Sequence, residues 1–328
     1  MFLGIDIAKD TFDVALIKNN EDAKKPRHKR FANTAAGHRQ LLCWLADHQV
    51  QQVHACLEAT GTYGEALALS LVEAGHPVSV VNPARISAFA KSQLSRTKTD
   101  KADAQLIATF CQTQKPALWT PPPVEARELQ ALVRRLAVLE EMLQMERNRL
   151  DSLGSSGSEG LVRGSLVEHI AHLEAQVQKT EQAIRAHINA HPSLKGRRDL
   201  LVSIPGVGET TAATLLAELP DVTQFSNARA VAAFAGLVPR IRQSGSSVRS
   251  RPRLSKTGSP RLRGALYWPA ITALRFNPLL KAMKERLTQR GKSKMAIIGA
   301  AMRKLLCLAY GILKSGKPFD PNFSAHRT

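Results

Sequence analysis

The first 110 residues alternate between short apolar runs and amphipathic stretches. Positions 2–7 are mostly apolar and every second residue of 12–17 is apolar, which predicts two strands. Further strands are predicted at 30–33, 53–57 and 78–81, with helices at 35–47, 63–73 and 100–111. The order βββαβαβα is that of an α/β RNase H-like (RuvC-like) fold. A Rossmann fold is disfavoured because the first turn, residues 6–10, lacks the glycine fingerprint.

The middle of the chain has the periodicity of two long helices. Apolar residues recur at threes and fours in each, at Leu129, Leu132, Leu136, Leu139 and Leu143, then at Leu166, Ile170, Leu173, Val177 and Ile184. A Gly/Ser-rich break at 154–164 separates the two stripes. This pattern predicts an antiparallel helical hairpin or a coiled coil between chains, serving as a spacer or an oligomerisation arm.

The last third of the chain is predicted to be mainly helical. The motif Ile204-Pro-Gly-Val-Gly208 precedes a helix and resembles the hairpin of helix-hairpin-helix modules. In that interpretation Gly206 and Gly208 let backbone amides approach a phosphate; a tight turn with a helix cap is the alternative. Apolar helices follow at 266–274 and 295–313. We therefore expect three domains, 1–118, 119–194 and 195–328.

The formal charge of +19 is concentrated in the last of these segments. Residues 1–110 carry a net charge of +2 and residues 111–194 a net charge of −1, whereas residues 195–328 carry +18. Such asymmetry favours contact with nucleic acid, although a solvated basic surface is the alternative. Eight cations and no acid occur between positions 240 and 263, at Arg240, Arg242, Arg249, Arg251, Arg253, Lys256, Arg261 and Arg263.

Cysteine spacing and hydropathy indicate the kind of cell compartment in which the protein acts. The four cysteines, at positions 43, 56, 111 and 307, show no metal-ligand spacing, so we expect reduced core residues. No uninterrupted apolar run reaches the roughly 18 residues of a membrane span. We expect a soluble cytoplasmic protein that acts on nucleic acid and has no membrane partner.

Four carboxylates form the first candidate site. Asp6 lies inside an apolar strand, where an unpaired charge is costly, and Glu58 ends a later strand. Asp100 and Asp103 are three residues apart, so they share a helix face, where helix capping is the competing explanation. Acids from separate elements are what two-metal phosphoryl chemistry needs, with the cations roughly 3.5–4 Å apart. Asp10 and Asp13 are expected to face solvent.

The segment Ser244-Gly-Ser-Ser247 forms the second candidate site. A serine can attack a phosphodiester when a base or metal takes its proton and cations stabilise the charge on phosphorus. Arg240, Arg242 and Arg249 are candidates for those cations. The alternative is a Ser/Gly/Arg loop that only follows a nucleic-acid backbone.

Eight short motifs follow one another along the chain: Gly4-Ile-Asp-Ile-Ala-Lys9, Leu57-Glu-Ala-Thr-Gly-Thr-Tyr63, Asn82-Pro83, Lys98-Thr-Asp-Lys-Ala-Asp-Ala104, Ile204-Pro-Gly-Val-Gly208, Phe234-Ala-Gly-Leu-Val-Pro239, Ser244-Gly-Ser-Ser247 and Leu313-Lys-Ser-Gly316. Taken in this order, they resemble the motifs of the DEDD transposases of the Piv/MooV type, the IS110 insertion-sequence family. The resemblance spans almost the full chain. Residues 154–164 show no match.

The resemblance implies roles for the four carboxylates and for Ser244, and it also implies a metal cofactor and nucleic-acid partners. Asp6, Glu58, Asp100 and Asp103 would be the acid tetrad of a RuvC-like domain that binds Mg²⁺, or Mn²⁺ in its place, and Ser244 would be the nucleophile of a C-terminal transposase domain. It also implies a coiled-coil arm and a homotetramer built from dimers. A noncoding bridge RNA would act as the guide by pairing with double-stranded target and donor DNA.

We therefore expect an RNA-guided, Mg²⁺-dependent DNA recombinase that moves an insertion sequence through a serine-linked intermediate. One alternative is a hydrolytic RuvC-like nuclease or Holliday-junction resolvase that uses the tetrad alone. A second is a nonenzymatic nucleic-acid-binding scaffold in which the acids only cap or stabilise the fold. Asp6 argues against the scaffold, because helix capping does not explain an acid within a strand.

Overall fold

The chain forms two compact units, Met1–Pro121 (unit 1) and Pro122–Thr328 (unit 2). The computed structural model describes residues 1–18, 26–59, 63–93, 99–153, 160–219, 221–240, 243–244, 248–249 and 253–322. Unit 2 contains the domain expected at 195–328 and all but the first three residues of the arm expected at 119–194.

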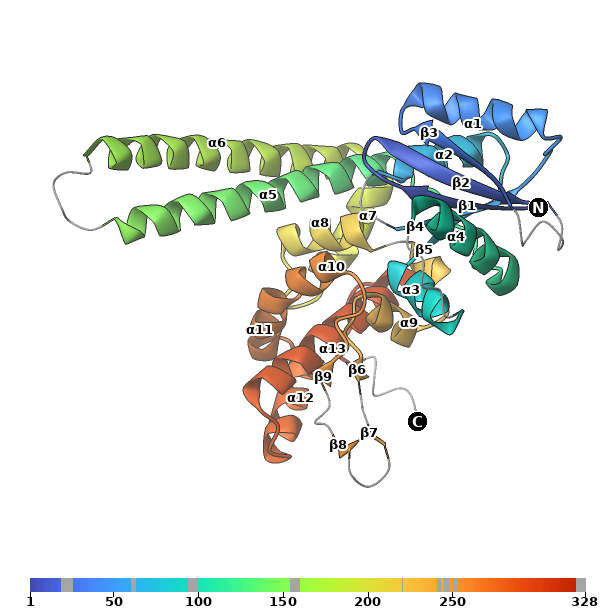
Figure 1. Ribbon diagram of the computed structural model, residues 1–328. Coiled ribbons are helices and arrows are strands. Elements are labelled where there is room, and N and C mark those ends of the chain that lie inside the picture. The colour runs from blue at the N-terminus through green and yellow to red at the C-terminus, as the bar shows by residue number, and fades with distance from the viewer. Residues whose placement is uncertain are drawn as a thin grey trace. The chain divides into compact units, whose positions relative to one another are not determined.

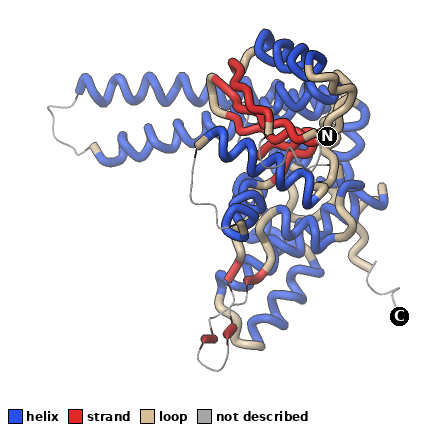
Figure 2. The backbone as a smooth tube through the Cα atoms, turned by 45° about the vertical axis from the view of Figure 1, so that its right-hand side comes forward, coloured by secondary structure: helices blue, strands red, loops and turns tan. Residues whose placement is uncertain are grey.

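Unit 1 contains a mixed five-stranded sheet (Figures 1 and 2). Its strands are β1 (Phe2–Ile7), β2 (Thr11–Ile17), β3 (Arg27–Ala32), β4 (His54–Glu58) and β5 (Val78–Val81). The spatial order is β3-β2-β1-β4-β5, antiparallel within the β1-β2-β3 meander and parallel from β1 through β4 to β5. This topology confirms the predicted RNase H-like fold.

The helices of unit 1 cover the sheet on two faces. They are α1 (Ala35–Asp47), α2 (Glu65–Glu73), α3 (Pro83–Ser92) and α4 (Asp100–Gln114). Leu3, Ile5 and Val14 pack in one core with apolar residues of α1 and α2. Ala15 and Ile17, which alternate with Val14 along β2, pack with α4 instead. Both faces of the meander are therefore covered.

Helix α3 is an element that the sequence analysis did not predict. Asn82 is its N-cap and accepts a hydrogen bond from the backbone N–H of Ala84, and Pro83 occupies the first helical position. Both are ordinary helix-start signals, so the helix was predictable from the Asn82-Pro83 pair.

Gly4 sets the distance between β1 and α4. A Cβ atom at this position would overlap the backbone of Ala104 and Ala108 on α4. The absence of a side chain therefore lets the helix pack directly against the strand. Because Asp6 lies two residues beyond Gly4 on the same face, the first turn of α4 comes close to this acid.

Unit 2 begins with a long antiparallel hairpin of α5 (Val124–Ser152) and α6 (Gly160–Ala190), which lie side by side (Figure 1). Leu139, Leu143 and Leu173 form the core within the arm. Near its base, Leu129 and Ile184 join the main core of the unit. The arm is thus a hairpin within one chain, as one of the two predicted alternatives. Residues 160–164, expected in the break, are helical.

The rest of unit 2 is helical around α13, with four very short strands (Figure 2). The elements are α7 (Pro192–Val202), α8 (Glu209–Glu218), a 3-10 helix (Val222–Gln224), α9 (Ala228–Phe234), β6 (Pro239–Arg240), β7 (Gln243–Ser244), β8 (Val248–Arg249), β9 (Arg253–Leu254), α10 (Pro260–Ala265), α11 (Tyr267–Phe276), α12 (Pro278–Gln289) and α13 (Lys294–Ser315). Strand β6 pairs with β9, and β7 pairs with β8.

Helix α13 is the central helix of the unit 2 core. By length and composition it could also cross a membrane, and it is the one such helix in the described part of the chain. Leu305, Leu306 and Ala309 are fully buried within the unit. Packing inside a protein core accounts for this apolar composition without a bilayer.

Candidate metal centre and nucleic-acid surface

Asp6 and Glu58 lie at the same edge of the sheet. Strands β1 and β4 are parallel neighbours, with Ile5 opposite Leu57, and each acid follows its residue of that pair. Both acids are half-buried near the carboxyl ends of their strands. The sheet register therefore brings together two acids that are 52 positions apart in the sequence.

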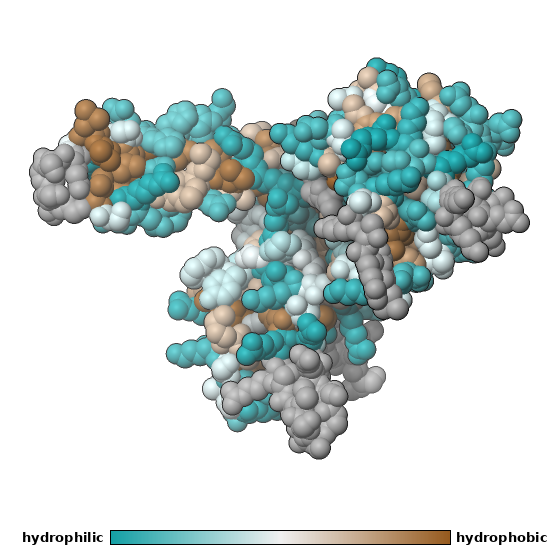
Figure 3. Space-filling model, viewed as in Figure 1, coloured by the Kyte–Doolittle hydropathy of each residue, from teal (hydrophilic) through white to brown (hydrophobic). Residues whose placement is uncertain are grey.

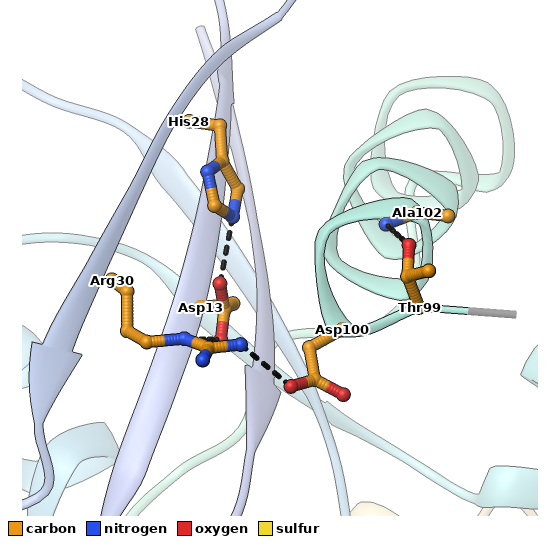
Figure 4. A network of polar contacts seen from close by, with 6 residues as sticks. All are labelled: Asp13, His28, Arg30, Thr99, Asp100 and Ala102. Atoms are coloured by element: carbon orange, nitrogen blue, oxygen red, sulfur yellow. Dashed lines mark hydrogen bonds and ion pairs between the residues drawn. The ribbon is translucent and has the colours of Figure 1, made fainter.

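Asp100 and Asp103 lie in the first turn of α4, as predicted. The helix is capped by Thr99, whose side chain accepts a hydrogen bond of 3.2 Å from the backbone N–H of Ala102 (Figure 4). Asp100 is therefore the first helical residue and not the N-cap that the capping hypothesis assigned to it. Acids in a first turn still favour the helix dipole, but the capping hydrogen bond does not need them.

The acids of this face influence one another electrostatically. The pKa of Asp6 is raised to about 6, mainly because the carboxyl group is partly buried and also because Asp103, Asp100 and Asp13 repel its charge. In the described ranges, no Lys, Arg or His forms an ion pair with Asp6. An acid that is desolvated and surrounded by other acids gains much from a bound cation.

Asp13 was expected to face solvent, but that expectation is wrong. It lies opposite Asp6 in the register of β1 and β2 and is only 2% exposed. Its two carboxylate oxygens contact the Nε2 atom of His28 at 2.7 Å and the Nε atom of Arg30 at 2.8 Å (Figure 4). The charge of Asp13 is thus balanced within the sheet. Asp10, in the turn, is exposed as expected.

Arg30 connects this buried acid to the predicted tetrad. Its Nη2 atom donates to Oδ2 of Asp100 at 2.6 Å (Figure 4). The ion pairs of Arg30 and His28 were not predicted from the sequence, because their partners lie on other elements. The one signal was the run of basic residues at 27–30, which is unusual for a strand.

The donor set fits a hard divalent cation. All four predicted ligands are carboxylates, and oxygen donors are what Mg²⁺ and Mn²⁺ prefer. Within the described part of the chain, no three His, Cys, Asp or Glu side chains are already gathered into a coordination shell. Asp100 and Asp103 are close enough to repel Asp6, and one oxygen of Asp100 accepts a hydrogen bond from Arg30. The four residues therefore offer the oxygen ligands that such a cation prefers and the negative charge that it would neutralise.

Ser244 lies in the two-residue strand β7, opposite Val248 of β8. Its side chain lies outside the described residues, as do positions 245–247 of the motif. Arg242 and Arg251 fall outside them as well, and for Arg249 only the strand β8 is described.

Two of the predicted nucleic-acid-binding arginines are cross-strand neighbours. Arg240 of β6 lies opposite Arg253 of β9, and both are exposed. Like charges placed opposite each other destabilise a two-stranded ladder, so this pair is suited to an anion. Lys256 and Arg261 are also exposed. These four cations are available to a phosphate backbone.

Arg263 differs from the other cations of this segment. Its Nη1 atom donates to the backbone oxygens of Ala235 at 3.1 Å and of Lys256 at 3.2 Å. The guanidinium thus holds two loops together, which favours a structural role.

The two glycines of the hairpin motif between α7 and α8 have different surroundings. Gly206 has a φ of +101°, and a Cβ atom there would lie 2.6 Å from the Cβ atom of Ala273 on α11. Gly208 is the exposed N-cap of α8, with no atom near its missing Cβ. Gly206 therefore serves helix packing, and Gly208 is the residue that a phosphate could approach.

An RNase H-like sheet with acids at the ends of β1 and β4 and on α4 is typical of enzymes that cut nucleic-acid backbones. Comparison with known proteins identifies the family. Residues 3–153 match the DEDD transposase model of the IS110 type, and residues 198–285 match the model described as "Transposase IS116/IS110/IS902 family".

Full-length relatives agree with these models. The pilin gene-inverting proteins of Moraxella bovis and Moraxella lacunata are each 36% identical over 97% of this chain and 97% of their own length. A transposase for insertion sequence element IS1111A from Coxiella burnetii is 27% identical over 83% of this chain and 78% of its own length. The chain belongs to the IS110/IS116 family of DEDD transposases and DNA invertases, enzymes of DNA strand cleavage and transfer.

Proposed function

We propose that this chain is a divalent-metal-dependent, RNA-guided recombinase that moves an insertion sequence through a serine-linked DNA intermediate. Asp6, Glu58, Asp100 and Asp103 hold the cation, and Ser244 is the nucleophile. The observation that carries the metal part of the proposal is the sheet register, which places Asp6 and Glu58 at one edge of the sheet, and the raised pKa of Asp6 agrees with it. Magnesium, when bound, would neutralise these acids and stabilise charge on the attacking and leaving oxygens.

The serine step explains why a recombinase would need more than carboxylates. A bond forms between Ser244 Oγ and phosphorus as the bond from phosphorus to one DNA oxygen breaks. The serine proton passes to a base, and the departing DNA oxygen takes up a proton. A DNA hydroxyl later attacks the phosphoserine and restores the serine. The phosphodiester energy is conserved, whereas hydrolysis by water would lose it.

Trapping of covalent adducts tests the role of Ser244. Wild-type protein, Ser244→Ala and the matched control Ser247→Ala are incubated with labelled donor and target DNA and Mg²⁺, then run on a denaturing gel. We expect adducts with wild type and Ser247→Ala and none with Ser244→Ala. Persistent adducts in Ser244→Ala would refute the assignment. Free DNA ends without adducts in wild type would favour a hydrolytic nuclease.

The proposed nucleic-acid partners are double-stranded DNA and a structured bridge RNA. Exposed Arg240 and Arg253, placed opposite each other, support contact with phosphates, although they do not distinguish RNA from DNA. Copurifying RNA would be sequenced and compared with the DNA that flanks the gene. Segments complementary to the joined DNA sites are expected. Activity of RNase-treated protein equal to that of untreated protein would exclude guidance.

Site-specific DNA inversion is a second candidate function. It is favoured by the 36% identity to the pilin gene-inverting proteins, which extends over 97% of the chain. A plasmid carrying both element ends distinguishes the two functions after expression of the protein. Sequencing would reveal an excised or inserted element in one case and a reversed segment in the other.

We further propose that the arm contributes to a homotetramer. Apolar side chains gather at the far end of the α5–α6 hairpin (Figure 3), where Leu161 and Val162 are exposed. Exposed apolar patches of this kind are typical of protein interfaces. Sedimentation equilibrium of wild type and Leu161→Ser tests this. We expect a smaller assembly for the variant, and equal masses would argue against the arm as the interface.

A further inference from the structure

Arg30 is the one described residue that forms ion pairs with both the structural acid Asp13 and the tetrad acid Asp100. Its Nε atom lies 2.8 Å from Oδ2 of Asp13, and its Nη2 atom lies 2.6 Å from Oδ2 of Asp100. Arg30 and Asp100 are separated by 70 positions in the sequence. The guanidinium therefore links the sheet to the first turn of α4.

Asp13 is a rigid anchor for this link. Its side chain is 4% exposed, and His28 occupies its other oxygen, so neither carboxylate oxygen is left to reorient. The guanidinium is planar, with donors in a fixed fork, so fixing Nε also fixes the direction of Nη2. The position of Asp100 is thus determined from the buried side of the sheet.

The side chain of Asp100 has more freedom to change its rotamer than that of a buried acid such as Asp13. The Asp100 side chain is 63% exposed at the start of a helix, where an aspartate can adopt several rotamers. The Arg30–Asp100 pair is itself exposed, and exposed ion pairs contribute little to stability because solvent screens them. Stability alone is therefore a weak reason for the arrangement.

We propose that Arg30 is a positioning residue for the metal centre. It holds Asp100 through Oδ2, so that Oδ1 would be the oxygen that binds a divalent cation, while Asp13 holds Arg30. This inference rests on the proposed function, because it assumes that Asp100 is a metal ligand. Hydrogen-bonding partners behind a metal ligand commonly change metal affinity by roughly 10- to 100-fold when they are removed.

The variant Arg30→Lys distinguishes an effect of the positive charge of Arg30 from an effect of its positioning of Asp100. The ammonium keeps the positive charge, but it is a point donor on a flexible stem and lacks the fork that joins two fixed carboxylates. If Arg30 acted only through its charge, its removal would strengthen cation binding and its replacement by lysine would change nothing. If it acts by position, Arg30→Lys weakens binding.

The test is a Mn²⁺ titration of the full-length protein, in which the EPR signal of free Mn²⁺ reports the dissociation constant. Arg27→Lys is the matched control, because Arg27 lies on the same strand but opposite Leu16 and is exposed. We expect about tenfold weaker binding or more for Arg30→Lys and no more than a twofold change for Arg27→Lys. Circular dichroism melts verify that each variant is folded.

A double-mutant cycle shows whether Arg30 acts through Asp100. In an Asp100→Asn background, Arg30→Lys should cause no further loss of Mn²⁺ affinity. Equal losses in both backgrounds would overturn the inference, as would wild-type affinity in Arg30→Lys alone. If wild-type protein binds no Mn²⁺, the metal centre of the proposed function fails together with this inference. If wild type binds and Arg30→Lys binds equally, only the inference fails.

Discussion

Asp6 and Asp13 are the same residue type, lie opposite each other in the sheet and face the same helix, yet their environments differ. Asp13 is paired with His28 and Arg30, whereas burial and neighbouring acids raise the pKa of Asp6 to about 6. A buried charge that serves the fold is neutralised by the chain itself. A half-buried carboxylate that has no ion pair within the described residues, such as that of Asp6, is instead one that a cation from solution would stabilise.

The largest expected effect is on catalysis. Asp6→Asn removes a metal-binding charge, and metal ions supply several kcal/mol of transition-state stabilisation, so recombination should fall by about 10³-fold or more. Quantitative PCR of recombinant junctions measures the loss. The variant should remain folded by circular dichroism. Activity within tenfold of wild type would remove Asp6 from the metal centre.

Gly4→Ala tests the approach of α4 to this face. The added Cβ would overlap the backbone of Ala104 and Ala108, so the helix must move or the strand must distort. Overpacking of this kind costs up to about 3 kcal/mol of unfolding free energy. Urea denaturation measures it, with Gly196→Ala as control, because open space surrounds Gly196 in α7. Equal losses in both variants would contradict the close approach.

Asp13→Asn should destabilise the protein where Asp6→Asn does not. The substitution replaces charge-assisted hydrogen bonds to His28 and Arg30 by weaker ones, at a cost of about 2 kcal/mol. Urea denaturation in EDTA at neutral pH gives the value. Asp10→Asn, at an exposed acid in the adjacent turn, serves as the control. Equal stability of Asp13→Asn and Asp10→Asn would show that the ion pairs contribute nothing.

The smallest expected effect is a pH-dependent gain in stability for Asp6→Asn. Folding raises the pKa of Asp6 from 3.8 to about 6, so its ionisation costs stability as the pH rises through that window. Asparagine does not ionise. In EDTA, thermal melts should show little difference from wild type at pH 4 and a more stable variant at pH 8. Solvent screening reduces the gain to about 1 kcal/mol. A pH-independent difference would contradict the raised pKa.

The sequence was sufficient to predict the five strands of the unit 1 sheet and the acids on β1 and β4, although β3 begins at Arg27 and not at the predicted position 30. The short strands of unit 2 were not predicted. Asp6 stood out because a charge within an apolar run demands compensation, and Glu58 ended a predicted strand. The topology then followed from the order of elements. These signals are local, so they can be read without knowing which helix covers which face.

Features that depend on α4 could not be predicted in the same way. Alternation along β2 suggested a solvated face for Asp13, but α4, which begins at Asp100, covers that face. The need for glycine at position 4 also appears only when α4 is in place. The link that Arg30 makes between the sheet and α4 could not be predicted either, because Asp100 is 70 positions away in the sequence.

Anomalous diffraction from crystals soaked in Mn²⁺ would show whether the acids of unit 1 bind a cation. We expect a manganese peak bound by carboxylate oxygens of Asp6, Glu58 and the first turn of α4, and the loss of that peak in Asp6→Asn. A peak beside Asp13, or one that persists unchanged in Asp6→Asn, would show that these acids do not form the metal centre.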